Sequence, residues 1–166
     1  MSPRKAQMLT LGSIHHVALE VADVETSERW YSTVLGAEVD RRTDVDEADL
    51  ASGRVRQVWM RVGELVVNLA QGRPIERGAD QHFVHVAVRS VGGTLAEWIT
   101  HLREHGVEVL GPYGHGGLPF VSLYFDDPDG YRWEIIVDFD SFEAATAESV
   151  RLGGRLGNPV ASYDWH

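Results

Sequence analysis

The side chains of this sequence that could do chemistry gather in one stretch, HGGLPFVSLYFDDPDGYRWE, which contains His115, Tyr124 and Glu134. Glu134 stands out because it lies within an apolar run formed by Trp133, Ile135, Ile136 and Val137. A carboxylate in such a strand needs a compensating partner, and a metal ion is one such partner. The stretch is therefore the first candidate for a metal site.

The same stretch is predicted to form a β-hairpin. Residues 119–125 and 131–137 are apolar runs rich in strand-forming residues. The DDPDG segment between them predicts a tight turn, because Pro presets φ and Gly can adopt a positive φ. Alternate residues of a strand share a face, so Ser122 and Tyr124 point to one side of their strand. On the returning strand, Glu134 shares its side with Arg132.

Two more histidines lie in strand-like runs, His16 in residues 14–21 and His85 in residues 83–88. The core side of the first run consists of Val17, Leu19 and Val21, so His16 faces another surface. Two neutral imidazoles and one carboxylate on one face of a metal leave open positions, which suits Fe(II), and Mn(II) also fits these ligands. The alternative is that His16, His85 and Glu134 are unrelated structural residues.

The elements around these residues occur twice in the order strand–helix–strand–strand–strand. The first copy covers residues 14–21, 24–35, 37–43, 54–62 and 65–70, and the second covers residues 83–88, 94–105, 107–110, 119–125 and 131–137. His16 precedes Asn68 by 52 residues and His85 precedes Glu134 by 49, so the two halves correspond. Because Asn68 is a poor metal ligand, three protein ligands are expected.

This duplication predicts an α+β fold in which two paired βαβββ modules form a cupped mixed sheet with the helices outside. The inward faces of the cup would bring His16, His85 and Glu134 together. A single domain is expected over residues 13–140, with a short helix at 141–152 in the tail. The leader, first module, linker, second module and tail are placed at residues 1–12, 13–70, 71–81, 82–140 and 141–166.

The composition argues against several classes of function. The net charge of −10 and the lack of a basic run argue against nucleic-acid binding. No stretch is long and apolar enough for a membrane span or a signal peptide. The absence of cysteine removes disulfides, thiolate ligands and thiol nucleophiles, and it fits the cytoplasm, where we expect the protein to act.

The repeated module, with a histidine in the first strand of each half and DPDGYRWE at the end, resembles the vicinal oxygen chelate (glyoxalase/bleomycin resistance/dioxygenase) superfamily over about residues 12–140. A more selective likeness is to the signature of type I extradiol dioxygenases. That signature is matched by His115, a gap of seven residues, and then Leu123-Tyr124, Asp127-Pro128, Asp129-Gly130 and Glu134. The sequence departs from it at Tyr113, where the signature has a small residue.

This resemblance implies an Fe(II)-dependent extradiol dioxygenase that cleaves a catechol with O2, similar to the short single-domain members, some of which act on L-DOPA. By analogy, His115 serves as the acid–base and Tyr124 hydrogen-bonds a substrate oxygen. Arg132 and His82 are the candidate substrate-binding residues. Related proteins pair such cups, so a homodimer is expected.

Three other functions are compatible with parts of the sequence. A glyoxalase or epimerase normally has a fourth metal ligand, where this chain has Asn68. A fosfomycin-type resistance transferase would carry lysine and serine in the loop before the last hairpin, whereas residues 107–122 contain one serine and no lysine. A metal-free drug-binding resistance protein would have the cup without the two-histidine, one-carboxylate set, so metal content distinguishes it.

Overall fold

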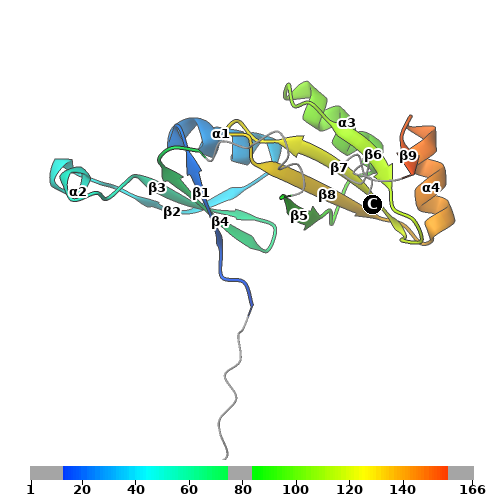
Figure 1. Cartoon of the computed structure of the whole chain (residues 1–166), viewed down its shortest axis with the longest axis horizontal. Coiled ribbons are helices and arrows are strands. Elements are labelled where there is room, and N and C mark those ends of the chain that lie inside the picture. The colour runs from blue at the N-terminus through cyan, green and yellow to red at the C-terminus, as the bar shows by residue number, and fades with distance from the viewer. Residues whose placement is uncertain (1–12, 75–83, 157–166) are drawn as a thin grey trace, which may run out of the picture.

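Two βαβββ modules lie side by side in the computed structural model, which describes residues 13–74 and 84–156 (Figure 1). The first module contains β1 (Val17–Val21), α1 (Val24–Val34), β2 (Glu38–Thr43), α2 (Glu47–Ala51), β3 (Gln57–Val62) and β4 (Leu65–Gln71). The second contains β5 (Val86–Arg89), α3 (Leu95–Glu104), β6 (Leu110–Gly114), β7 (Phe120–Asp126) and β8 (Arg132–Asp138), and it is followed by α4 (Phe142–Arg151) and β9 (Arg155–Leu156). The predicted leader, most of the predicted linker and His82 lie outside the described residues.

Each module has its own mixed sheet, with strand order β1-β4-β3-β2 in the first and β5-β8-β7-β6-β9 in the second. In both modules the first and last strands of the βαβββ unit are parallel neighbours. Ala18 lies opposite Asn68 in the first sheet, as Ala87 lies opposite Glu134 in the second. The predicted α+β fold of two similar modules is confirmed, and the register makes Asn68 the counterpart of Glu134.

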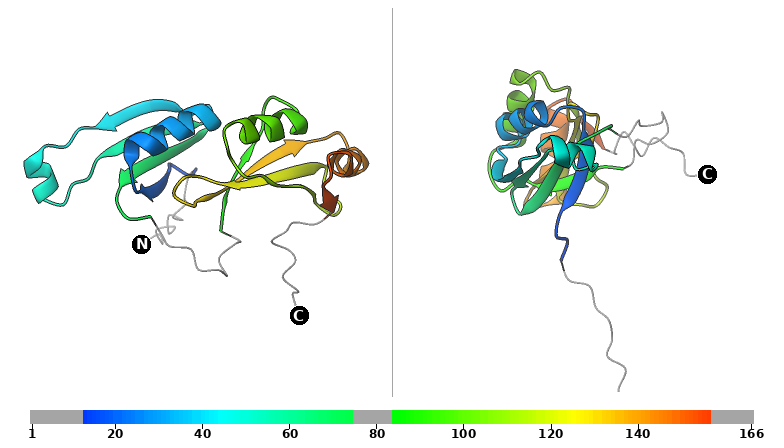
Figure 2. Two further views of the ribbon diagram at one scale, coloured as in Figure 1. Left: turned by 90° about the horizontal axis from the view of Figure 1, so that it is seen from above. Right: turned by 90° about the vertical axis from the view of Figure 1, so that its left-hand side faces the viewer.

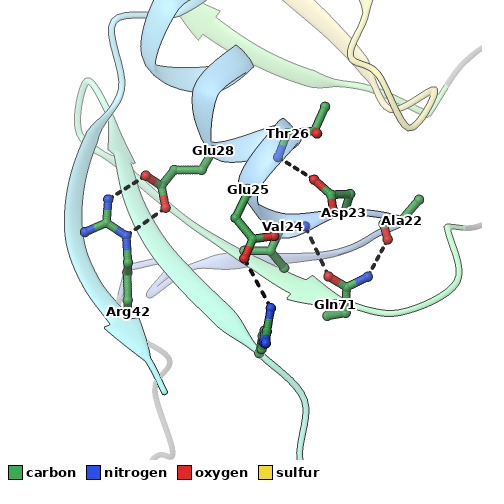
Figure 3. A network of polar contacts seen from close by, with 9 residues as sticks. Ala22, Asp23, Val24, Glu25, Thr26, Glu28, Arg42 and Gln71 are labelled. Atoms are coloured by element: carbon green, nitrogen blue, oxygen red, sulfur yellow. Dashed lines mark hydrogen bonds and ion pairs between the residues drawn. The ribbon is translucent and has the colours of Figure 1, made fainter. Parts of the chain in front are cut away.

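The two main helices begin where the sequence provides an N-cap. At the start of α1, the Asp23 carboxylate accepts a hydrogen bond from the Thr26 N–H at 2.7 Å, and the Gln71 side chain of β4 accepts one from the Val24 N–H at 3.2 Å (Figure 3). Thr94 begins a capping box at the start of α3. A cap of this kind stabilises a helix by about 1 kcal/mol. Within the part of the chain that the structure describes, no helix is long and apolar enough to cross a membrane.

Both helices cover the same side of the molecule, and Figure 2 shows them next to each other from above. Their buried faces are formed by Val24, Ser27, Tyr31 and Val34 of α1 and by Leu95, Ile99 and Leu102 of α3. The strands turn their apolar residues toward this side. Because side chains alternate along a strand, the polar residues Ser122, Tyr124 and Glu134 lie on the opposite side.

The turn between β7 and β8 fastens the second module to the first. Asp127 accepts a hydrogen bond from the Tyr31 hydroxyl of α1 at 2.6 Å and from the backbone N–H groups of Asp129 and Tyr131 in its own turn. Asp129 in turn accepts a hydrogen bond from the Ser27 hydroxyl at 2.8 Å. The DPDG sequence is therefore both a hairpin turn and a contact between modules.

Three segments differ from the sequence prediction. The acidic segment 44–53, predicted as a loop, contains α2, because Asp46 and Asp49 form a capping box there. β6 lies C-terminal to the predicted strand 107–110 and overlaps it by one residue. Part of the segment predicted as a tail belongs to the folded domain. The helix α4 matches the helix expected at 141–152, whereas β9, which was not predicted, extends the second sheet by pairing with β6.

Candidate metal centre

Glu134 is the centre of a polar cluster on the second sheet. Its side chain lies in the middle of β8, with the residue only 5% exposed. His85 Nε2 lies 2.7 Å from Glu134 Oε2, while the hydroxyls of Ser122 and Tyr124 donate hydrogen bonds to Oε1 at 2.5 and 2.9 Å. These residues meet because β8 lies between β5 and β7 in the sheet, with Tyr124 directly opposite Glu134.

The contacts of Glu134 favour its ionised form. Burial raises the pKa of this carboxyl group, but the hydrogen bonds with His85, Ser122 and Tyr124 outweigh burial and hold the pKa of Glu134 below its usual range. An ionised carboxylate beside an imidazole nitrogen suits a divalent metal ion. The donor chemistry of the second sheet therefore fits two ligands of the predicted metal site.

His115 joins the cluster through Ser122, with Nε2 2.8 Å from the serine Oγ. Because the Ser122 hydroxyl already donates its proton to Glu134, it accepts a hydrogen bond from His115. This places the ring proton on Nε2 and leaves Nδ1 as the accepting nitrogen. Burial lowers the pKa of His115, against a smaller opposing effect of Glu134, and this favours the neutral imidazole.

His16 lies apart from this cluster, exposed and directly before β1 in the first sheet. Its ring centroid is 4.8 Å from that of Trp59. Among the described residues, no three histidine, cysteine, aspartate or glutamate side chains are arranged to hold a metal ion. One chain therefore does not bring His16 to His85 and Glu134. The modules pack through α1 and the β7–β8 turn, and each module retains a separate sheet.

The first sheet carries counterparts of the cluster without the carboxylate. Asn68 is buried and donates a hydrogen bond to Gln57 Oε1 at 2.9 Å. Trp59 lies opposite Asn68, as Tyr124 lies opposite Glu134. At corresponding positions, the first sheet therefore has the amide of Asn68 and the second has the carboxylate of Glu134. The candidate metal ligand of the first sheet is His16.

Of the two predicted substrate-binding residues, Arg132 and His82, the structure describes only Arg132. Arg132 lies on the same side of β8 as Glu134, but its guanidinium forms two hydrogen bonds with the Asp126 carboxylate, at 2.9 and 3.0 Å. His82 lies outside the described residues. Ser122 also belongs to the site, although no role was predicted for it from the sequence. Its position on the same strand face as Tyr124 was the available signal.

Comparison with known proteins gives a family match over most of the chain. Residues 13–135 match the model of the Glyoxalase/Bleomycin resistance protein/Dioxygenase superfamily. Metallothiol transferase FosB of Staphylococcus epidermidis (strain ATCC 12228) is 27% identical over 128 residues, which are 76% of this chain and 82% of the relative. The FosB of Bacillus licheniformis is 27% identical over 155 residues, which are 91% and 93% of the two chains.

Solved structures show the same fold at lower sequence identity. The fosfomycin resistance protein FosX of Listeria monocytogenes superposes with a TM-score of 0.64 at 16% identity, over 79% of this chain and 97% of its own. The same protein has been solved with Mn(II) and a sulfate ion. An integron cassette protein of V. cholerae superposes with a TM-score of 0.56 at 24% identity, over 79% and 98% of the chains.

These similarities overturn the prediction of an extradiol dioxygenase that cleaves a catechol such as L-DOPA with O2. The relatives that align with most of the chain are named for thiol transfer and fosfomycin resistance. The structure explains why the dioxygenase signature led to a wrong prediction of function. The spacing of His115, Tyr124 and Glu134 builds hydrogen-bond support around one carboxylate, directly from Tyr124 and through Ser122 from His115. That support is useful to any enzyme with a carboxylate ligand at this position.

Proposed function

Because the chain belongs to the glyoxalase/bleomycin resistance/dioxygenase superfamily, we propose that it is a metal-dependent transferase that adds a thiol to a small anionic epoxide, with fosfomycin as the first substrate to test. The observation that carries this proposal is the buried Glu134 carboxylate, held beside His85 by Ser122 and Tyr124. The relatives named metallothiol transferase supply the class of reaction.

His85 and Glu134 would hold a divalent metal together with His16 from a second copy of the chain. In the proposed homodimer, the His16 side of one protomer covers the Glu134 side of its partner. Two-fold symmetry makes this exchange reciprocal, so the dimer has two equal sites. Mn(II) is the first metal to test, because a fosfomycin resistance protein of the same fold was solved with it. Fe(II), expected from the sequence, is the second.

The reaction breaks one C–O bond of the epoxide and forms one C–S bond, and the thiol proton ends on the new alkoxide. When bound, the metal supplies Lewis acidity to the epoxide oxygen. His115 accepts the thiol proton at Nδ1 and returns it to the product. Ser122 and Tyr124 hold Glu134 in place. The predicted cytoplasmic location suits this chemistry, because thiols persist in reducing compartments.

The test uses full-length protein loaded with Mn(II) or Fe(II) without air. Fosfomycin is added with L-cysteine, with glutathione, or with no thiol, and products are followed by phosphorus NMR and mass spectrometry. A thiol adduct that depends on the metal supports the proposal. Formation of a diol without thiol would replace transfer by hydration, and no product in any arm would overturn the proposal.

Replacing the proposed carboxylate ligand gives a second test. Glu134→Gln retains the size of the side chain but removes the negative charge, so metal occupancy and turnover are expected to fall by about 100-fold. Occupancy is measured by metal analysis after dialysis. Asp138→Asn, at the exposed end of the same strand, is the matched control and should retain both. Full occupancy of the Glu134→Gln protein would exclude Glu134 as a ligand.

A further inference from the structure

The first sheet carries a cation–π pair on the side that bears His16. The guanidinium carbon of Arg41 lies 4.9 Å from the centroid of a Trp59 ring, and the His16 ring lies 4.8 Å from Trp59. Arg41 is the cross-strand partner of Trp59, and Trp59 is that of Asn68. Cross-strand partners share a side of the sheet, so this pair lies on the side that would cover the metal site in the proposed dimer.

Arg41 differs from most arginines of the first module because its guanidinium has no carboxylate partner among the described residues. Its neighbour Arg42 pairs with Glu28 of α1 (Figure 3). A guanidinium held over an aromatic ring still has N–H groups that can make a two-point contact with an anion. Stacking on Trp59 also holds the side chain in place, which lowers the entropy lost on binding.

The order of the strands separates Arg41 from His16. His16 precedes β1 and Arg41 lies in β2, which are the two outer strands of the first sheet. Their side chains approach each other more closely than these strands do, because the His16 ring lies 4.8 Å and the Arg41 guanidinium carbon 4.9 Å from the Trp59 ring. An epoxide held at the metal beside His16 leaves Trp59 and Arg41 for a second substrate. A thiol lying over Trp59 would place its far end at Arg41.

We propose that Arg41, stacked on Trp59, binds the carboxylate of an anionic thiol co-substrate. This inference rests on the proposed function, because it requires the first sheet to face the metal site. The chemistry of the second sheet supports it. Residues 107–122 contain no lysine, and Arg132 is already paired with Asp126. In the proposed dimer, Arg41 of the first sheet offers the cation for a second anionic substrate.

The test compares an anionic thiol, 3-mercaptopropionate, with a neutral one, 2-mercaptoethanol. In Arg41→Gln protein, the KM for 3-mercaptopropionate should rise about tenfold or more, because a charge-assisted contact is lost. The KM for 2-mercaptoethanol and for fosfomycin should stay unchanged. Arg41→Lys retains the charge without the flat stacking surface and should give an intermediate KM. Arg42→Gln is the matched control and should leave every KM unchanged.

A binding measurement separates this inference from the proposed reaction. Calorimetry follows 3-mercaptopropionate binding to the Mn(II)-loaded protein without epoxide, and Arg41→Gln should weaken it by the same factor. Arg41-dependent binding without adduct formation would support the anion site and overturn the transferase. Adduct formation in which Arg41→Gln affects both thiols equally, or raises only the KM for fosfomycin, would overturn the anion site.

Discussion

Ser122 is the residue that links the candidate acid–base group to the candidate metal ligand. Its hydroxyl is fully buried, accepts a hydrogen bond from His115 and donates one to Glu134. A hydroxyl has a single proton to donate, so the direction of both bonds is determined. Ser122 therefore selects the His115 tautomer in which Nδ1 is left to accept a proton.

Replacing His115 tests its role in proton transfer. In His115→Gln protein, the amide N–H group can still donate to Ser122 but no nitrogen can take up a proton. Turnover should fall roughly 10²–10⁴-fold while metal occupancy stays unchanged. His105→Gln, on the exposed end of α3, is the control.

The pH dependence of kcat/KM gives an independent check on His115. Because burial lowers the pKa of this imidazole, the wild-type protein should retain its activity to a lower pH than an ordinary histidine would allow, and should lose it where the ring becomes protonated. The His115→Gln protein should lack this acid limb. Near-normal turnover of His115→Gln protein, or an acid limb that is unchanged in it, would remove His115 from the mechanism.

At the residue scale, the sequence predicts side chains that share a strand face better than it predicts their partners. Alternation and the repeat led to His85 and Glu134, and the resemblance to a family signature led to Tyr124; the structure brings all three together. Ser122 and Arg41 have no spacing pattern of their own, because a single serine or arginine in a strand is common. Their roles depend on which side chains lie opposite them.

At the element scale, the β7–β8 turn joins the two modules through a buried carboxyl group. Asp127 is 5% exposed, and burial raises its pKa to about 6, although hydrogen bonds from Tyr31 and from the backbone of Tyr131 oppose this. A carboxyl group with a higher pKa in the folded protein binds its proton more tightly there. Its contribution to stability is therefore present at low pH and is lost as the pH rises from about 4 to about 6.

Asp127→Asn should remove this pH dependence. Over that interval the free energy of unfolding of the wild type should fall by about 2–3 kcal/mol relative to the variant, measured by urea unfolding of the metal-free protein at several pH values. Asp138→Asn, which alters an exposed carboxylate, should retain the wild-type slope. Parallel curves for wild type and Asp127→Asn would show that Asp127 does not bind its proton on folding.

Element positions follow the sequence where a long periodic pattern exists, as in α1 and α3. α2 and β9 were not predicted, because five and two residues are too short to show a period. α2 had a local signal in the Asp46–Asp49 capping box. β9 depends on the close approach of Gly154 to Pro112, where a Cβ would lie 2.1 Å from the carbonyl oxygen. Such a contact between distant segments is visible only in the folded chain.

At the scale of the whole molecule, β1 and β5 are corresponding edge strands of the two sheets, whose other edges are β2 and β9. His16 directly precedes β1 and His85 directly precedes β5. An edge strand offers unpaired backbone groups to another chain. In the proposed dimer, each protomer would supply His16 to one metal site and His85 with Glu134 to the other. The cup predicted from the sequence requires residues of both modules to face each other. Strand patterns show which residues share a face of one sheet, but not how two sheets pack together.

Mixed dimers test this shared site. His16→Ala and Glu134→Gln proteins are co-expressed with different tags, and the heterodimer is isolated through both tags. One of its sites combines both defects while the other is intact, so it should have about half the wild-type activity, although each variant alone is inactive. An inactive heterodimer of confirmed composition would mean that the site is not shared between protomers.

The separation of His16 from Glu134 also determines how many working sites remain when one copy of the gene is mutated. In the proposed dimer, a chain without Glu134 still lends an intact His16 to a normal partner. A cell with one damaged and one normal allele would therefore lose working sites in proportion to the damaged chains, with no dominant effect on the normal ones. Two alleles damaged in different modules would complement each other.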